Sequence, residues 1–274
     1  MDPRTTTTTL CPILAVPGLY ISDRFAARSN PLLIEHGITH ILSIVRWEDL
    51  PRAPAYGAGA ETNTDPNKDP ATGAQSIIRK HVDLDDDPTE DLLAQLESML
   101  EWVHDAIGPA PLNKDAKSGR ASERVREKDT IIPGRGRGRG RVLVHCNQGI
   151  SRSGSVIVAY IMKYLSLPYA AALSTARESR GLIGPNIGFE YQLRMWEGCG
   201  FDVFLKEEET QNQEQDASQE GEQRQRKEKP EYAAWKGEVV QVYNHQHYQD
   251  FQRAKEEWIQ SLVVRLGVLG KDDA

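Results

Sequence analysis

The sequence contains few cysteines, few aromatic residues and no long hydrophobic run. Its 3 cysteines cannot all pair as disulfides, and none lies in a Cys-x-x-Cys pair of the kind that holds zinc. An apolar stretch such as Val156–Met162 is far shorter than the roughly 18 residues that a membrane-spanning helix needs. The first residues lack the basic and apolar regions of a secretory signal. We therefore expect a cytoplasmic or nuclear protein with reduced thiols, no metal and no membrane contact.

The content of hydrophobic residues is also low, at 39% with 7% aromatic. Chains that are folded throughout have about 45 to 50%, so part of this chain is expected to be unpacked. A length of 274 residues allows one domain with disordered additions. The net charge of -7 argues against a surface that binds nucleic acid over its whole extent.

Four segments have the polar composition of unpacked chain and no sustained apolar period. They are 1–12, 51–76, 108–140 and 205–230, predicted as a disordered N-terminus, two disordered insertions and a disordered linker. Beyond the linker, residues 231–274 have apolar residues at helical steps of three and four. This pattern predicts a helical extension that docks on the domain or on a partner.

The remaining chain alternates between two kinds of hydrophobic pattern. Runs rich in Ile and Val predict buried strands at 19–21, 38–45, 77–84 and 142–144. Apolar residues on one helical face predict helices at about 92–107 and 156–164. Strands interleaved with helices indicate an α/β domain over residues 13–204, with a central, mostly parallel sheet flanked by helices.

The segment Val142–Gly154 is an apolar strand that passes through a loop of small residues into an apolar helix. Such a loop directs backbone N–H groups and the positive end of the helix dipole at one point, where an anion can bind. Gly149 would let the loop curl, and the same field would favour the thiolate form of Cys146. Arg152 can hold two phosphoryl oxygens in a fork. The alternative for Cys146 is an inert buried thiol, the interpretation we prefer for Cys11 and Cys199.

The motif His145-Cys146-x-x-Gly149-x-x-Arg152-Ser153 resembles the signature of the cysteine-based protein tyrosine phosphatases, and the region resembles their dual-specificity branch. Residues 17–22, 37–42 and 185–193 agree with that branch. The resemblance implies that Cys146 attacks phosphorus to give a phosphocysteine, that Arg152 binds the phosphoryl oxygens, and that Ser153 helps the sulfur to leave. It further implies that His145 orients the loop and tunes Cys146, and that no cofactor takes part.

The same resemblance assigns phosphate binding to the whole loop. The substrate-binding residues it implies are Asn147, Gln148, Gly149, Ile150, Ser151 and Arg152. Asn147 and Gln148 depart from the usual pattern of the branch, in which Ala often precedes the glycine. This departure affects the expected shape of the pocket and leaves the chemistry intact.

Hydrolysis also needs a carboxyl group that protonates the leaving group and later activates water. In the acidic run Asp83–Asp91, Val82 and Leu84 face the core, so alternation places Asp86 on their side of the strand. Asp87 has another interpretation, as the N-cap of a helix with Pro88 at its first position and Glu90 in a capping box. We therefore predict Asp86 as the general acid. A strand bulge, or a purely solvated acidic loop, is the alternative.

Several other polar residues have structural interpretations that we prefer. Asn186 after Pro185 predicts a helix N-cap, and Arg177 and Arg180 are expected to be solvated helix residues. His245 and His247 have no further ligand at metal spacing and are assigned to the surface.

The basic run of alternating Gly and Arg at residues 134–141 is a candidate for weak contact with RNA or acidic proteins, or for steering phosphorylated substrate. Phosphorylated proteins, on phosphotyrosine and on phosphoserine or phosphothreonine, are the expected partners of a chain predicted to be monomeric. Two alternatives stay open: a phosphatase of a lipid, RNA or glycan ester, and a phosphate-binding scaffold without catalysis.

Overall fold

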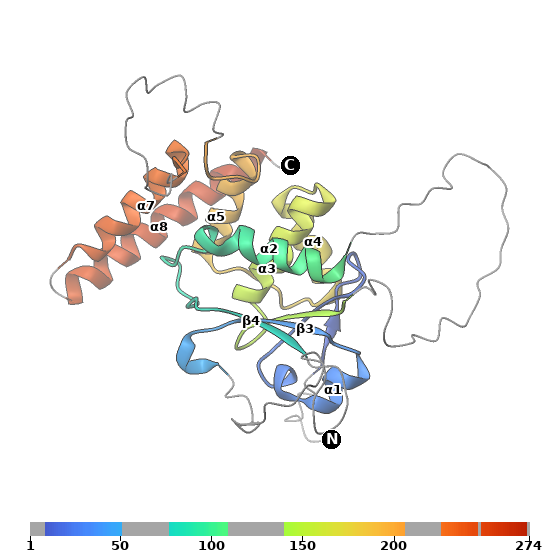
Figure 1. The fold of residues 1–274 in the computed structure, drawn as a ribbon. Coiled ribbons are helices and arrows are strands. Elements are labelled where there is room, and N and C mark those ends of the chain that lie inside the picture. Colours follow the sequence, from blue (N-terminus) through green and yellow to red (C-terminus); the bar gives the residue numbers. More distant parts are fainter. Residues whose placement is uncertain (1–8, 51–76, 109–139, 206–225, 246–247, 273–274) are drawn as a thin grey trace, which may run out of the picture.

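A computed structural model describes residues 9–50, 77–108, 140–205, 226–245 and 248–272 (Figure 1). The predicted insertion 51–76 lies outside the described residues, as does the predicted insertion 108–140 apart from its two end residues. Residues 134–139 of the Gly-Arg run and His247 also lie outside them.

A five-stranded sheet forms the centre of the molecule, with the strand order β1-β2-β5-β3-β4. The strands are β1 (Cys11–Pro12), β2 (Leu19–Ser22), β3 (His40–Ile44), β4 (Ile78–Val82) and β5 (Val142–His145). Only β1 is antiparallel to its neighbour, and the other pairs are parallel. The prediction of an α/β fold with a mostly parallel central sheet is confirmed.

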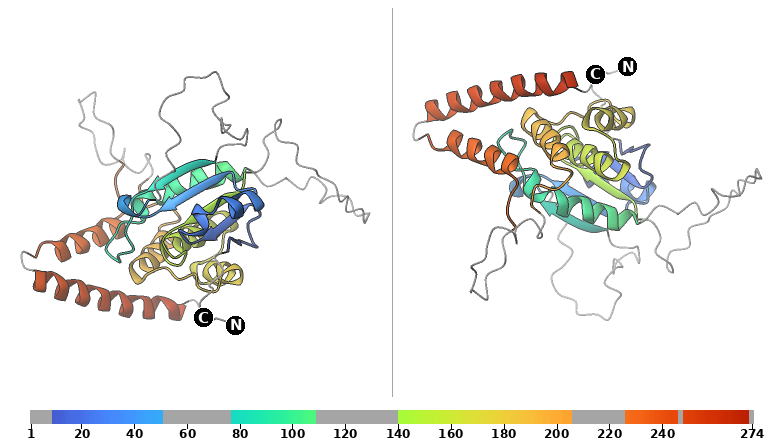
Figure 2. Two further views of the ribbon diagram at one scale, coloured as in Figure 1. Left: turned by 90° about the horizontal axis from the view of Figure 1, so that it is seen from below. Right: turned by 90° about the horizontal axis from the view of Figure 1, so that it is seen from above.

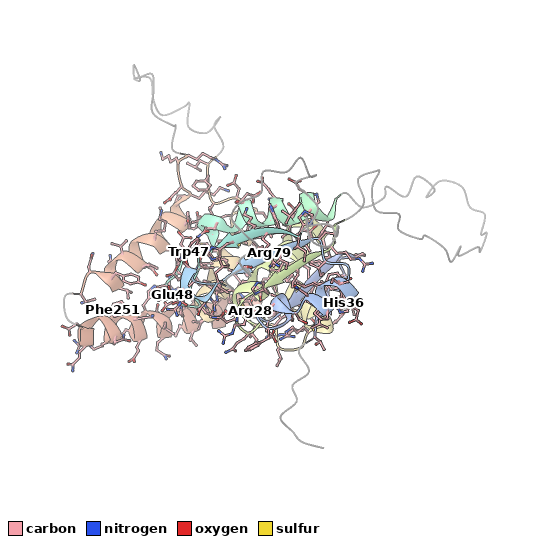
Figure 3. All side chains as sticks on the ribbon, turned by 60° about the horizontal axis from the view of Figure 1, so that its bottom comes forward. Arg28, His36, Trp47, Glu48, Arg79 and Phe251 are labelled. Carbon is pink, nitrogen blue, oxygen red and sulfur yellow. The ribbon has the colours of Figure 1, made fainter. Side chains whose placement is uncertain are left out.

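Helices cover both faces of this sheet because its strands alternate between two apolar clusters. Val142 and Val144 of β5 face the larger cluster, and Leu143 between them faces the smaller one. On the larger side lie α2 (Leu93–Ile107) and α3 (Arg152–Leu165), with α4 (Tyr169–Ser179) and α5 (Ile187–Gly198) packed on α3 (Figure 1). On the other side lie the short helices η1 (Ala26–Arg28) and α1 (Asn30–Glu35), and η2 (Trp47–Asp49) follows β3. Arg28 and His36 mark this second side in Figure 3.

The C-terminal part of the chain forms a helical hairpin of α7 (Pro230–Tyr243) and α8 (Tyr248–Asp272), seen in both views of Figure 2. Its inner residues Tyr232, Trp235, Trp258 and Leu262 belong to the same buried cluster as the sheet and α3. The hairpin therefore packs on the domain and shares its core. No single helix in the described part of the chain has the length and hydropathy of a membrane span, and α3 with α4 qualifies only as a pair bent by 119°.

Two of the predicted disordered segments are wrong at their ends. Cys11–Pro12 form β1, and Leu10 is only 5% exposed in the smaller cluster, because apolar side chains here cover the edge of β2. At the end of the predicted linker, residues 226–230 turn back onto the domain, where Lys229 N donates to Val203 O over 2.8 Å.

The helix predicted at about 92–107 is confirmed, but the interpretation of Asp87 as a helix N-cap with Pro88 at the first helical position is wrong. α2 begins at Leu93 and not at Pro88. The Asp87 carboxylate accepts hydrogen bonds from the backbone N–H and the hydroxyl of Thr89, at 2.9 and 2.6 Å, which closes a turn and not a helix. Asp91 instead accepts from Ala94 N in the first turn of α2, at 3.0 Å. An Asx turn and a helix N-cap share the same first hydrogen bond, so sequence alone does not separate them.

Candidate active site

The loop between β5 and α3, residues 146–151, curls tightly against the end of β2. Gly149 has φ +69°, and a Cβ at this position would lie 2.5 Å from the carbonyl oxygen of Ser22. Only glycine fits both the left-handed backbone and this close approach. Backbone N–H groups of neighbouring segments fix the rest of the loop: Arg24 N donates to Asn147 O at 3.3 Å, and Gly184 N donates to Ile150 O at 3.1 Å.

The sulfur of Cys146 lies at the centre of this loop, with the residue 1% exposed. The backbone N–H of Gly149 and the hydroxyl of Ser153 both donate to Sγ, each at 3.2 Å. The two donors come from the loop and from the first turn of α3, whose N-terminus adds a positive potential. The sulfur is thus held as a hydrogen-bond acceptor.

His145 lies behind the sulfur on the opposite face of the sheet and is buried. Its Nδ1 lies 3.2 Å from Cys146 O, and its Nε2 lies 2.8 Å from the hydroxyl of Ser43. Burial lowers the pKa of His145 to about 4, so the ring is neutral at pH 7. A carbonyl only accepts, so the single N–H is on Nδ1 and Ser43 donates to Nε2. His145 therefore orients the loop backbone and holds no exchangeable charge.

Arg152 begins α3 and is only 4% exposed. One guanidinium nitrogen donates to Leu84 O at 3.0 Å. Its Nε has no hydrogen-bond partner among the described residues. A buried cationic donor with spare capacity beside the cysteine suits an anionic ligand with several oxygens.

Of the acidic run, Asp86 is the residue that reaches the loop. Its Oδ1 accepts from the hydroxyl of Ser151 at 2.6 Å and from the side-chain amide of Asn186 at 2.9 Å. Asp83 turns away to the backbone N–H of Trp47, and Asp85 lies 3.9 Å from Arg46. The predicted acid therefore lies at the loop, although β4 ends at Val82, so an alternation of strand residues does not account for its position.

The side chain of Asn147 points to the β3 end of the sheet, where its amide donates to Asp49 at 3.1 Å. This hydrogen bond, more than the nearby arginines, holds the pKa of the Asp49 carboxyl below its ordinary value. Asn147 is one of the two loop residues that depart from the usual pattern of the branch, and its side chain is bound to Asp49. The backbone of Gln148, next in the loop, is bound by Arg180 through a 3.1 Å hydrogen bond to its carbonyl.

The prediction of a solvated helix residue is wrong for Arg180, which is half-buried just after α4, whereas Arg177 is exposed on α4 as predicted. Arg180 Nε donates to Gly149 O at 3.0 Å, and Arg177 Nε donates to Ile183 O at 2.8 Å. Both side chains anchor loop backbone through these hydrogen bonds. Asn186 does cap α5, accepting from Phe189 N at 2.9 Å, and its amide nitrogen also binds Asp86. The capping pattern revealed the first role, and no local pattern indicates the second, since it depends on an acid 100 residues away.

The described residues contain no cluster of three or more His, Cys, Asp or Glu side chains that could hold a metal ion. His245, one of the two histidines considered for that role, lies just after α7.

Comparison with known sequences shows which family this site is similar to. A sequence model of the dual specificity phosphatase catalytic domain matches residues 111–199. Bovine (Bos taurus) dual specificity protein phosphatase 26 is 30% identical over 179 residues, which are 65% of this chain and 63% of that protein. Mouse (Mus musculus) dual specificity protein phosphatase 12 is 29% identical over 188 residues, 68% of this chain and 41% of that protein.

The chain thus spans less than two thirds of the length of these relatives. Among solved structures, human DUSP28 covers 70% of this chain and 95% of its own, at 24% identity and a TM-score of 0.48. The family match covers the cysteine loop, Arg152 and Asn186. Residues 111–199 thus match the catalytic-domain model of the dual specificity phosphatases, and the chain is similar to that branch of the cysteine-based protein tyrosine phosphatases.

Proposed function

We propose that this chain hydrolyses phosphate monoesters of proteins, on tyrosine and on serine or threonine, through a phosphocysteine intermediate. The observation that carries the proposal is the convergence of one sulfur, one arginine and one carboxyl group on a single loop. Cys146 Sγ accepts two hydrogen bonds in that loop, Arg152 opens the helix behind it, and Asp86 is tied to its Ser151.

In the first step Cys146 Sγ attacks phosphorus, so that an S–P bond forms while the bond from phosphorus to the ester oxygen breaks. The guanidinium of Arg152 and the loop N–H groups neutralise the phosphoryl oxygens as charge shifts. Asp86, protonated for this step, gives its proton to the departing oxygen. The product alcohol or phenol leaves and the enzyme carries the phosphoryl group.

In the second step water attacks the phosphocysteine. Asp86, now a carboxylate, takes a proton from the water, and the S–P bond breaks to release inorganic phosphate. The Ser153 hydroxyl lies 3.2 Å from Sγ, where it donates to the sulfur as negative charge returns to it. His145 stays neutral and takes no proton in either step, because burial keeps its pKa at about 4.

The proposed substrate class rests on the similarity to named relatives together with one feature of the chain. The relatives at 30% and 29% identity are named as dual specificity protein phosphatases. We find no sequence insertion resembling the deep-pocket phosphotyrosine loop of the strictly tyrosine-specific branch. Both points support action on phosphotyrosine and on the shorter phosphoserine and phosphothreonine side chains.

The test compares the full chain with Cys146→Ser on phosphotyrosyl and phosphothreonyl peptides, with EDTA present throughout. We expect the wild type to release phosphate from both peptides and the variant from neither. The variant should still bind tungstate, because Arg152 and the loop N–H groups remain. Equal activity in the variant would contradict the covalent mechanism, and a wild type that loses its activity in EDTA would contradict a metal-independent one. Hydrolysis of the phosphotyrosyl peptide alone would narrow the substrate class.

A further inference from the structure

The segment that carries Asp86, residues 83–92 between β4 and α2, is held from two sides. On one side lies α5. A Cβ on Gly188 would lie 1.9 Å from Pro88 O, so this helix touches the segment directly. The buried side chain of Gln192 accepts from Leu92 N at 2.9 Å and donates to Glu90 O at 2.8 Å. These contacts belong to the domain itself and fix the end of the segment nearer α2.

On the other side lies the C-terminal hairpin, toward which the segment extends in Figure 1. Lys255 of α8 forms an ion pair with Asp87, the direct neighbour of Asp86. The hydroxyl of Tyr243, at the end of α7, lies 2.7 Å from the hydroxyl of Thr89. Tyr232, at the start of α7, donates to Asp91 at 2.7 Å. Residues of the hairpin thus bind the segment at three places within five residues of Asp86.

In the hydrogen bonds around Asp87, each hydroxyl donates toward the Asp87 carboxylate. Thr89 donates its hydroxyl proton to the Asp87 carboxylate at 2.6 Å, so its oxygen can only accept from Tyr243. The Tyr243 ring is itself held at the tip of the hairpin by Phe251, at 5.4 Å between ring centres (Phe251 is marked in Figure 3). Tyr243, Thr89 and Asp87 therefore form a connected set with Lys255 at its end.

Three members of this set are partly shielded from water, whereas Tyr243 is 52% exposed. The side chains of Lys255 and Asp87 are 17% and 28% exposed, and Thr89 is 4% exposed. Burial alone would raise the pKa of the Asp87 carboxyl, but the hydrogen bonds from Lys255 and Thr89 outweigh it and hold the pKa below its ordinary value. An ion pair shielded to this degree orders its backbone more than an exposed one does.

We propose that Lys255 and Tyr243 are positioning residues for the general acid: through Asp87 and Thr89 they hold the acid segment with Asp86 turned toward the phosphate loop. The proposal rests on the proposed function, in which Asp86 protonates the leaving group. Proton transfer requires the carboxyl group within hydrogen-bond reach of the ester oxygen, so a small displacement of the segment lowers the rate. The C-terminal hairpin is then part of the catalytic apparatus although it offers no group to the phosphorus.

The experiment uses the full chain and two aryl phosphates that differ in how much they need the acid. Phenyl phosphate has a poor leaving group, whereas 2,4-dinitrophenyl phosphate expels a stable anion that needs no proton. The value of kcat/KM covers the steps up to ester cleavage, so the ratio of the two values reports acid function. In Lys255→Met and in Tyr243→Phe, kcat/KM for phenyl phosphate should fall at least about threefold, and by less than the roughly 10² to 10⁴ expected for loss of the acid itself. The value for the dinitrophenyl ester should stay near that of the wild type.

Two control variants remove contacts of the hairpin that do not involve the acid segment. Tyr191→Phe deletes a hydroxyl that accepts from Arg265 and joins α5 to α8. Arg253→Met deletes an ion pair with Asp250 that stays within α8. Both should keep the wild-type ratio of the two kcat/KM values.

A conservative variant keeps the test open if Lys255→Met fails to fold. Asp87→Asn retains the acceptor for Thr89 and removes the charge that faces Lys255. It should therefore lower kcat/KM for phenyl phosphate relative to the dinitrophenyl ester in the same way. The double variant Asp87→Asn/Lys255→Met should be no worse than either single variant. An unchanged ratio in all three single variants, or an equal fall for both substrates, would overturn the positioning role. A wild type that hydrolyses neither ester would overturn the proposed function first, and this proposal with it.

Discussion

At the scale of single residues, the assignment of Asp86 as the general acid gives the most specific prediction. Asp86→Asn should lower kcat/KM for phenyl phosphate by roughly 10² to 10⁴, because the amide has no proton to give, and the loss should shrink for a dinitrophenyl ester. Asn can keep the hydrogen bonds of Ser151 and Asn186 at its remaining oxygen, so the fold should be unchanged. If Asp85→Asn shows this pattern and Asp86→Asn does not, the carboxyl group has been misassigned.

His145 makes a prediction about stability and pH. In the unfolded chain its pKa has the ordinary value of 6.5, and in the folded chain burial lowers the pKa to about 4. Between these values the unfolded chain binds the extra proton and the folded chain does not, so acid favours unfolding. The contribution is complete above pH 6.5 and is lost as the pH falls toward 4, at about 1.4 kcal/mol per pH unit or roughly 3 kcal/mol in all.

The measurement is the free energy of unfolding by urea between pH 7 and pH 4, for the wild type and His145→Asn. The variant has no group that titrates here, so its stability should fall less steeply than that of the wild type. Parallel curves for the two proteins would mean that the pKa of His145 is the same in the folded and the unfolded chain.

At the scale of elements, the cysteine loop depends on one backbone position. Gly149→Ala would place a Cβ 2.5 Å from Ser22 O in a left-handed conformation. We expect it to lower the free energy of unfolding by more than about 1 kcal/mol and to weaken tungstate binding, because the N–H that donates to Cys146 must shift. Gly198→Ala is the matched control, since its Cβ would meet nothing within 4 Å in a helix. It should be stabilising by about 0.5 to 1 kcal/mol. If Gly149→Ala and Gly198→Ala changed the free energy of unfolding equally, the close approach of residue 149 to Ser22 O would not be what requires glycine there.

The elements also differ in how well the sequence pattern predicts them. β5 and α3 were predictable because an apolar strand and an apolar helix face the core through continuous side-chain periods. The role of Asp87 was not, because Asp87 closes a turn with the same first hydrogen bond as a helix cap. β1 was missed because Cys11–Pro12 is too short to show any period and forms only through its pairing with β2.

At the scale of the whole molecule, the C-terminal hairpin should unfold together with the domain. Leu262 of α8 is fully buried in the cluster that includes the sheet. Leu262→Ala should lower the free energy of unfolding by about 2 to 5 kcal/mol in a single transition. Val264→Ala, at a position that is 68% exposed on the same helix, should change it by less than about 0.5 kcal/mol. Two separate transitions in denaturant would show that the hairpin is an independent unit.

The sequence by itself determined the α/β fold and the resemblance to the dual-specificity phosphatases, because periods of two and of 3.6 residues and one short motif are local properties of the chain. It also singled out Cys146 and Arg152, which lie within one loop and the turn that follows. Only the tertiary structure decided which distant groups meet that loop: Asn186 at Asp86, Arg180 at the loop carbonyls, and Lys255 at Asp87. The physical reason is that these contacts join elements far apart in the chain, and no local period or propensity encodes which side chain arrives at a shared surface.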